Sequence, residues 1–385
     1  MAHKVAIVGV AQTKYQENRP DCREAELVYE VVSKVLENMG LPHTWEGMGI
    51  DAAVTCSSDL WDGRTISSAT VQDVVGAHGR TENKVADDAI NAVYYAMAAI
   101  LSGKHETVLV AAHTKESNAT YKSVVENSFF DPILMRPLGL DFLSAAALQA
   151  KRYMDRYGIT KEQCAKVAVR SLKNAGNNPF AQRAMDITVD DVLHSRTLVS
   201  PIRLLDAKPV SDGAVAMILT TEEKAGTLTD KPVWISGAEN CYNSHYLGER
   251  ELSDCEALRS AAQRAYRMAG ITNPLKEIDV AEISAEYSYQ ELLWTEGLGF
   301  CAGGEGGRLI DSGSTDMDGE LPVNPSGGTL AGNPSMIAGM ARAAEAVLQL
   351  RGEANGRQIP EAKTALAHGF TGACGQHQCV LILEK

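Results

Sequence analysis

Two stretches of small and apolar residues, one in each half of the chain, constrain the fold most. Residues 87–102 carry alanines at helical spacing and stop at Gly103, and residues 335–350 repeat the pattern with glycine and alanine. Helices with such small side chains can pack closely against each other. Because both stretches are too apolar to face water, we expect them to lie side by side at a pseudo-two-fold centre.

Around these two helices the sequence alternates between helical patterns and short β-branched runs. The runs predict strands near 5–10, 52–56, 107–112, 214–220, 233–237, 279–283, 364–368 and 380–383. Such alternation favours an α/β sheet that is covered on both faces. The polar, helical stretch from 115 to about 205 interrupts it and predicts an inserted subdomain. We therefore expect two α/β units, residues 1–230 and 231–385.

Charge and composition limit the partners. With 36 Lys and Arg against 49 Asp and Glu, the formal net charge of −13 argues against a general affinity for nucleic acid or for anionic membranes. The longest apolar run, 92–101, is shorter than the roughly 20 residues of a membrane span, and the run at 5–11 lacks a cleavage site, so we expect a cytoplasmic protein. The eight cysteines form no CxxC pair and the nine histidines no HExxH motif, so we expect neither a disulfide framework nor a bound metal.

Short motifs follow one another in a specific order over most of the chain. They occupy residues 147–158, 178–182 (NPFAQ), 201–206 (PIRLLD), 210–214 (VSDGA), 299–307 and 321–328 (LPVNPSGG). In this order they resemble the thiolase superfamily, in particular its branch similar to sterol-carrier-protein thiolases. The resemblance implies a thiolase fold of two βαβαβαββ halves with an inserted loop domain that covers coenzyme A. It also implies a homodimer, a coenzyme A thioester as substrate and no tightly bound cofactor.

At the four positions where thiolases carry catalytic groups, this sequence differs. The loop that holds their nucleophilic cysteine has Ala86 in its place, and their Gly-His-Pro triplet is Gly332-Asn333-Pro334. The third motif corresponds to Ser284-Ala-Glu-Tyr287, and His368 stands where many thiolases keep a second cysteine. Only a thiolate takes an acyl group from a thioester readily at neutral pH. We therefore expect catalysis without a covalent acyl-enzyme on the usual loop.

Five side chains remain as candidate catalytic groups, namely Asn333, His368, Glu286, Tyr287 and Cys374. From the chemistry of these side chains we expect Asn333 to hold the thioester oxygen and His368, aided by Glu286 or Tyr287, to move the proton. Each also has a structural interpretation, as a satisfied buried histidine, a carboxylate at a helix start or a packing tyrosine. Cys374 lies in a glycine loop and is either a relocated nucleophile or a small buried hydrophobic residue.

A local cluster of positive charge offers a site for the phosphates of coenzyme A. Residues 147–173 contain seven Lys or Arg, among them Lys151 and Arg152, against two acidic residues. The alternative for about half of these side chains is an ordinary solvated helix face. Ser211 and Gly213 match the Ser/Asn-Asp-Gly-Ala loop that lies along the pantetheine arm in the family.

Three functions stay open on this evidence. The first is an acyl-CoA C-acyltransferase that catalyses thiolysis or Claisen condensation of a 3-oxoacyl-CoA. The second is a cysteine-independent retro-aldolase that cleaves a 3-hydroxyacyl-CoA, and the third is a non-catalytic thiolase-fold subunit of a complex. The resemblance also implies a small partner subunit built from a zinc ribbon and an OB fold.

Overall fold

One mixed sheet of nine strands runs through the molecule. The computed structural model describes residues 4–43, 47, 49–332 and 334–385. Its strands are β1 (Val5–Gln12), β2 (Ala52–Cys56), β3 (Thr81–Val85), β4 (Thr107–Lys115), β7 (Asp212–Thr221), β8 (Val233–Tyr242), β9 (Val280–Ile283), β10 (Thr364–Thr371) and β11 (His377–Glu384). They follow the order β3-β2-β4-β7-β1-β8-β11-β10-β9.

The sheet contains the same strand pattern twice. In the first half β2 is parallel to β3 and β4, and β7 is antiparallel to β4 and β1. In the second half β9 is parallel to β10, and β11 is antiparallel to β10 and β8. The counterpart of β3 is reduced to a single bridge between Ala281 and Val323. The predicted architecture of two βαβαβαββ halves is confirmed, and the pairing of β1 with β8 joins the halves into one sheet.

Helices cover both faces of this sheet. The principal ones are α1 (Glu24–Asn38), α3 (Ala89–Leu101), α9 (Glu256–Ala269), α11 (Ser288–Gly297) and α13 (Ala338–Arg351). Alternate side chains of a strand point to opposite faces. In β7, Val215 and Met217 pack in the core around α3 and α13, whereas Ala214 and Ala216 pack in the core around α1. The period-two pattern of the strands therefore separates the central helix pair from the outer helices.

The two central helices occupy the predicted positions and contact each other. Apart from its ends, α13 is buried almost throughout. On α3 the face away from α13 stays open, because Tyr95 is 42% and Leu101 is 44% exposed. A helix this apolar was expected to be covered on all sides, so the open face of α3 differs from the prediction.

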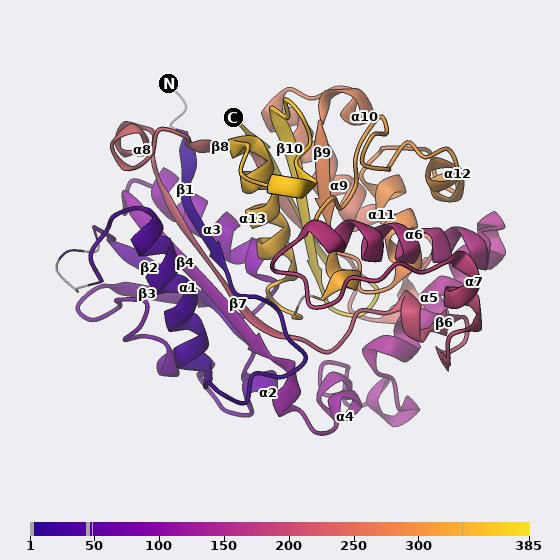
Figure 1. Ribbon diagram of the computed structural model, residues 1–385. Helices are drawn as coiled ribbons and strands as arrows, with labels where there is room; N and C mark the ends of the chain where they lie inside the picture. The colour runs from indigo at the N-terminus through magenta and orange to yellow at the C-terminus, as the bar shows by residue number, and fades with distance from the viewer. Residues whose placement is uncertain (1–3, 44–46, 48, 333) are drawn as a thin grey trace.

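The segment between β4 and β7 is mainly helical. It contains α4 (Lys122–Asn127), α5 (Phe142–Tyr157), α6 (Lys161–Asn174), α7 (Val189–His194) and the short hairpin β5 (Thr197–Val199) and β6 (Ile202–Arg203). Side-chain caps start three of the helices. Asp141 accepts from the N–H of Ser144 at 2.7 Å, Thr160 from that of Gln163 at 3.2 Å and Thr188 from that of Asp191 at 3.2 Å. In Figure 1 the magenta helices of this segment lie beside the C-terminal half, where α6 contacts α11 and α12 (Gly306–Asp311).

The shorter helices are α2 (Asp59–Asp62), α8 (Glu222–Leu228) and α10 (Pro274–Glu277). Among the helices of the described residues, none is long and apolar enough to cross a membrane.

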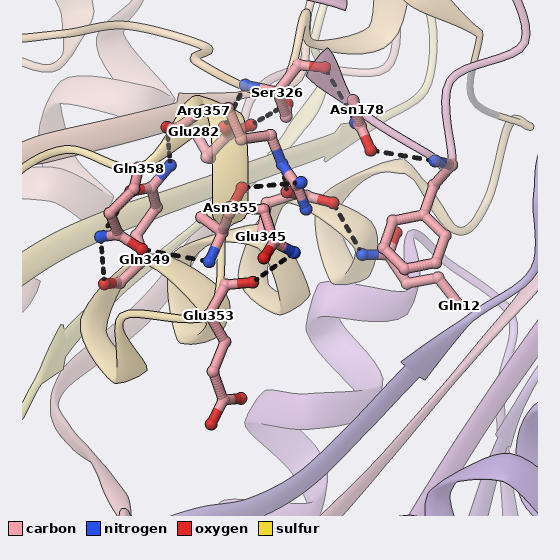
Figure 2. A network of polar contacts seen from close by, with 12 residues as sticks. Gln12, Asn178, Glu282, Ser326, Glu345, Gln349, Glu353, Asn355, Arg357 and Gln358 are labelled. Atoms are coloured by element: carbon pink, nitrogen blue, oxygen red, sulfur yellow. Dashed lines mark hydrogen bonds and ion pairs between the residues drawn. The ribbon is translucent and has the colours of Figure 1, made fainter.

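Buried ion pairs hold α13 in place. Arg342 Nη1 lies 2.6 Å from Glu282 Oε2 on β9, and Arg357 Nε lies 2.8 Å from Glu345 Oε2. Figure 2 shows that Glu345 also accepts a hydrogen bond from Gln12 of β1, at 2.9 Å. A buried charge is stable only when it is paired and hydrogen-bonded. These contacts connect α13 to strands of both halves and thereby fix its position against the sheet.

Candidate active site

The first of the four motif segments, the turn at 86–88, meets two others at the start of the central helices. The backbone N–H of Asp88 donates to Thr371 Oγ1 at the end of β10, at 2.7 Å. The N–H of Ala89 donates to the carbonyl of Met336 at 2.6 Å, which joins the starts of α3 and α13. The turn therefore lies against both the segment that precedes α13 and the end of β10.

The third motif segment lies beside the fourth. The N–H of Ser284 donates to the carbonyl of His368 at 3.1 Å, and that of Ala285 to Thr329 Oγ1 at 3.3 Å. Asn333, the candidate for holding the thioester oxygen, lies outside the described residues. Within the described residues, the chain thus gathers the sequence-predicted motifs at one end of the central helices.

Asp88 caps both central helices. Its carboxylate accepts hydrogen bonds from Ile90 N on α3 at 2.9 Å and from Gly339 N on α13 at 3.0 and 3.1 Å. The N–H of Asn91 donates to the Asp88 carbonyl at 2.9 Å. Together with Ala89, the first three backbone donors of α3 are therefore occupied by the protein itself.

The slot around this carboxylate depends on two glycines. A Cβ on Gly339 would lie 2.4 Å from Asp88 Oδ1, and a Cβ on Gly369 would lie 2.8 Å from it. Burial raises the pKa of Asp88 to about 7, in spite of the hydrogen bonds from Ile90 and Gly339, which lower it. An acidic group that titrates near neutral pH thus lies close in sequence to Ala86, the position of the thiolase nucleophile.

The described cysteines around this point are poorly suited to attack a thioester. The thiol of Cys56 donates to the carbonyl of Asp87 at 3.0 Å, but it is fully buried and burial raises its pKa well above the usual range. Cys374, in the hairpin between β10 and β11, is 4% exposed and donates to the carbonyl of Ala145 at 3.2 Å. Burial raises the pKa of Cys374 to about 12. Both thiols therefore stay protonated at neutral pH.

An ionic cluster stands next to the helix starts. It consists of Glu116, Lys122, Glu126, Lys208 and Glu286. Lys208 Nζ lies 2.6 Å from Glu116 and 3.8 Å from Glu286, and Lys122 Nζ lies 3.8 Å from Glu116 and 3.6 Å from Glu126. Three carboxylates and two ammonium groups thus share one site.

The carboxylates of the ionic cluster differ in their electrostatics. Burial raises the pKa of Glu116, but Lys122 and Lys208 outweigh it and lower the value to about 2. Burial raises the pKa of Glu126 to about 7 despite the nearby Lys122. The Glu286 side chain is the most accessible of the three, with 19% exposed against 8% for Glu126 and none for Glu116.

Hydrogen bonds attach the ionic cluster to the predicted motifs. Glu116 accepts from the N–H of Ser335 at 2.9 Å and from that of Ser211 at 3.1 Å. Lys208 donates through Nζ to Ser335 Oγ at 2.8 Å and through its N–H to the Glu286 carbonyl at 2.8 Å. One buried carboxylate therefore links the segment before α13 to the loop that resembles the pantetheine-binding loop.

A cleft of about 740 Å³ opens beside Lys208. The charged side chains in its lining are Lys14, Glu17, Arg183 and Lys208. Ser211, close by, is fully buried and donates to Gln182 Oε1 at 2.5 Å. At Gly213 a Cβ would lie 2.4 Å from the Tyr15 ring, so the glycine there makes room for a tyrosine. The cleft offers three cations against one carboxylate next to the ionic cluster.

Tyr287 and Tyr289 stack on each other with ring centroids 6.4 Å apart. Tyr287 is 8% exposed, and Tyr289 donates to Gln149 Oε1 at 2.9 Å. Burial raises the pKa of both hydroxyls well above the usual range. They act at neutral pH as hydrogen-bond donors and not as bases.

His368 points away from the central helices. It is fully buried between Trp294 and Phe370, and its Nε2 lies 2.7 Å from Gln378 Oε1. Burial lowers its pKa to about 4, so the imidazole is neutral at pH 7. Sequence reasoning passed over His377, the histidine that contacts the turn before α3 through Asp87. His368 lies on β10 on the same face as Leu366, whereas His377 lies on β11 on the same face as Cys379, which packs around the central helices. The alternation of side chains along each strand is the signal that distinguishes the two histidines.

Most of the basic side chains in 147–173 are paired with carboxylates. The pairs are Lys151–Asp155, Arg152–Glu251, Arg156–Glu251, Lys166–Asp311 and Arg170–Glu291. Three of these partner carboxylates, Glu251, Glu291 and Asp311, come from outside the segment and were not counted in the local charge balance. Lys161 and Lys173 have no carboxylate partner among the described residues. The free positive charge of this patch is therefore smaller than the sequence suggested.

Sequence and structure comparisons agree with this geometry. Residues 5–223 match the family described as thiolase, N-terminal domain, and residues 238–385 match the thiolase C-terminal domain-like family. The chain belongs to the thiolase family. It is 34% identical over 381 residues to an acetyl-CoA acetyltransferase of Methanothermobacter thermautotrophicus, which covers 96% of this chain and 97% of the relative.

Two further relatives place this thiolase-family chain more closely. It is 30% identical to human sterol carrier protein 2, over 96% of this chain and 70% of that protein. A solved structure described as the Ltp2-ChsH2(DUF35) aldolase superposes with a TM-score of 0.82 at 28% identity, over 99% of this chain and 97% of that one. The predicted membership of the sterol-carrier-protein type branch and the thiolase fold are confirmed. Enzymes of this family act on coenzyme A thioesters.

Proposed function

We propose that this chain breaks or forms the carbon–carbon bond next to a coenzyme A thioester by retro-aldol or aldol chemistry on a 3-hydroxyacyl-CoA. One observation carries the proposal. The start of α3, where a thiolase holds its nucleophile, contains no thiol, and its first backbone donors are occupied by Asp88 and Met336. A covalent acyl-enzyme would need both a thiolate and free donors at this place. A retro-aldol cleavage needs neither.

The chemistry requires a base for the 3-hydroxyl proton and a donor for the enolate oxygen. Glu286 suits the first role because it is the most accessible carboxylate of the ionic cluster. Lys208, 3.8 Å from Glu286, supplies positive charge beside it. Asn333 remains proposed as a ligand of the thioester oxygen and Tyr287 as a neighbouring donor, whereas His368, neutral and buried, is proposed only as a group behind the site.

The relatives support two versions of this chemistry. A structural neighbour at 28% identity is described as an aldolase, which favours the retro-aldol route. The relative at 34% identity is named an acetyl-CoA acetyltransferase, which favours acyl transfer. We rank the retro-aldol route first because acyl transfer would need a nucleophile, and the candidate for a relocated one, Cys374, is a buried thiol with a raised pKa.

We also propose a homodimer and a partner subunit. The open face of α3 and the strand β3 at the edge of the sheet would be covered by a second copy. The aldolase neighbour is described together with ChsH2(DUF35), which supports a small zinc-ribbon and OB-fold partner here. Coenzyme A is proposed to place its phosphates on the 147–173 segment or in the cleft beside Lys208.

The experiment is to incubate the purified protein, alone and with candidate partner subunits, with a set of 3-hydroxyacyl-CoA and 3-oxoacyl-CoA esters. We expect a carbonyl compound and a shortened acyl-CoA from the hydroxy esters without added free coenzyme A, and no acyl mass on the intact protein. Cleavage of the oxo esters that requires free coenzyme A, with an acyl adduct on a cysteine, would instead establish a thiolase. No turnover of either set would favour the non-catalytic subunit.

A further inference from the structure

Three titratable side chains meet in the turn before α3, outside the ionic cluster. The Asp87 carboxylate accepts a hydrogen bond from His377 Nδ1 and lies 3.5 Å from the Tyr242 hydroxyl. The rings of Tyr242 and His377 stack almost in parallel, with centroids 3.6 Å apart and 10° between the planes. We refer to Asp87, Tyr242 and His377 as the Asp87 cluster. Its members come from three separate parts of the sequence.

The Asp87 cluster has a buried part and an accessible part. The side chains of His377 and Asp87 are 5% and 14% exposed, whereas Tyr242 is 64% exposed. A carboxylate only accepts hydrogen bonds, so Nδ1 of His377 carries a proton toward Asp87. The other ring nitrogen, Nε2, is buried without a hydrogen-bond partner among the described residues. The buried pair of Asp87 and His377 thus supports the aromatic ring of Tyr242, which reaches solvent.

The strand register fixes this arrangement. Tyr242 ends β8 and lies directly across from His377, which begins β11. Asp87 precedes Asp88, the residue that caps α3 and α13. The Tyr242 hydroxyl therefore lies next to the position at which a thiolase presents its nucleophile, on the accessible side of the helix starts.

We propose that Tyr242 contacts the substrate and turns its hydroxyl proton from Asp87 to the thioester oxygen as the enolate forms, while Asp87 and His377 are positioning residues, Asp87 holding the imidazole on which the Tyr242 ring stacks. This inference rests on the proposed function. Partial burial, together with the nearby Asp87, raises the pKa of Tyr242, so its hydroxyl keeps its proton at neutral pH and remains a donor. Preorganised donors aimed at a developing oxyanion are among the largest contributions to such reactions.

The proton balance of the cleavage closes without an oxidant or a reductant. Glu286 takes the proton of the 3-hydroxyl, the bond between the α and β carbons breaks, and its electron pair becomes the enolate of the shortened acyl-CoA. The β carbon leaves as a ketone or an aldehyde. The proton on Glu286 then passes to the α carbon, and Tyr242 keeps its own proton throughout.

The test uses Tyr242→Phe, which keeps the ring that stacks on His377 and removes only the hydroxyl. Two rates are measured, the cleavage of a 3-hydroxyacyl-CoA and the exchange of the α protons of acetyl-CoA with D2O. Both should fall by about 10²-fold, as expected when one oxyanion donor is removed. Binding of acetyl-CoA should change little. The matched control is Tyr29→Phe, an exposed tyrosine on α1. Asp87→Asn should lower kcat by a smaller factor and leave KM unchanged.

The outcomes separate this inference from the proposed function. If the wild type exchanges the α protons of acetyl-CoA and Tyr242→Phe does not, the role of Tyr242 is supported. If, in addition, the wild type cleaves no hydroxy ester, only the retro-aldol proposal fails. Wild-type rates in Tyr242→Phe overturn the role of Tyr242 and leave the retro-aldol proposal intact. A wild-type protein that binds acetyl-CoA but neither exchanges protons nor cleaves any ester overturns both.

Discussion

The carboxylate of Asp88 accepts hydrogen bonds from the backbone N–H of Gly339, at 3.0 and 3.1 Å, across 251 residues of sequence. Asp88 is the N-cap of α3, and Gly339 lies in the first turn of α13. One side chain therefore joins the starts of the two central helices, one from each half of the fold. The turn before α3, which serves acyl transfer in a thiolase, here connects the two central helices.

The Asp88 carboxylate makes the free energy of unfolding depend on pH. The pKa of Asp88 is raised to about 7 in the folded protein, whereas an unfolded aspartate titrates near about 4. Between these values the folded state binds more protons, so the contribution of Asp88 to stability is lost as the pH rises through this window. In Asp88→Asn the amide oxygen can still accept from both N–H groups. The free energy of unfolding of the wild type, measured in urea relative to Asp88→Asn, should fall between pH 4 and pH 7. A constant difference would contradict the raised pKa.

Glu286 should be essential if it is the base. Glu286→Gln keeps the size of the side chain and removes the carboxylate. The loss of a general base typically costs 10² to 10⁴ in rate, so kcat should fall by at least about 10²-fold at unchanged thermal stability. Glu222→Gln, on the exposed side of α8, is the matched control and should keep full activity. Equal kcat values in the two variants would mean that another group of the ionic cluster is the base.

Cys374 should be dispensable. Its thiol is buried and donates to the carbonyl of Ala145, and a serine hydroxyl can make the same hydrogen bond. We expect Cys374→Ser to retain activity, and we expect iodoacetamide to leave Cys374 unmodified in the folded protein at pH 7, because the raised pKa keeps it as a thiol. The checks are steady-state kinetics and peptide mass spectrometry. An acyl or carbamidomethyl group on Cys374 would support the alternative that Cys374 is a relocated nucleophile.

The basic segment can be tested through its partner carboxylate. Glu251 pairs with both Arg152 and Arg156, and Arg152 is half-exposed. If this patch holds the phosphates of coenzyme A, Glu251→Gln should tighten binding and Arg152→Glu should weaken it. The expected change is roughly two- to fivefold in each direction, because exposed charges interact weakly. Calorimetry at low and high salt measures both effects. Unchanged affinity in both variants would assign the phosphates to the cleft beside Lys208.

The buried ion pair on α13 should be costly to break. Glu345 and Arg357 are each 1% exposed. Arg357→Met leaves a buried carboxylate without its cation, and such a change costs about 3–5 kcal/mol. Urea unfolding should show this loss, and the double variant Arg357→Met with Glu345→Gln should recover part of it. A loss below about 1 kcal/mol in the single variant would mean that water replaces the guanidinium.

The sequence patterns predicted most of the fold because most strands are buried on both faces. The strand expected at 52–56 coincides with β2, and the two central helices lie where their small residues indicated. β3 was missed because Thr81–Val85 reads TENKV, a polar stretch without an apolar alternation. Edge strands tolerate such residues because one side is not covered by a neighbouring strand. Local periodicity therefore finds the apolar strands, β9 at the other edge included, and overlooks the polar edge strand β3.

The site was harder to predict, because its contacts join distant residues. Motif order indicated that the segments around Ala86, Ser284 and His368 converge, as they do. The contact between Asp87 and His377 spans 290 residues and depends on the register of β11, which no local pattern reveals. The Glu251 and Asp311 partners of the basic segment were missed for the same reason. The roles assigned to Glu286, Tyr287 and Asn333 stay predictions.

The place of β1 in the sheet has a consequence for how the protein is made. Among the strands of this sheet β1 is synthesised first, yet its neighbours are β7 and β8, with Val5 opposite Thr221 and Ala6 opposite Trp234. At about 5–20 residues per second, roughly 10 to 40 seconds pass before these partners are synthesised. During that time the apolar strand β1 has no neighbouring strand with which to form hydrogen bonds. Neither half of the sheet can be completed before β7, which ends at Thr221, has emerged, so β1 of the growing chain stays unpaired until then.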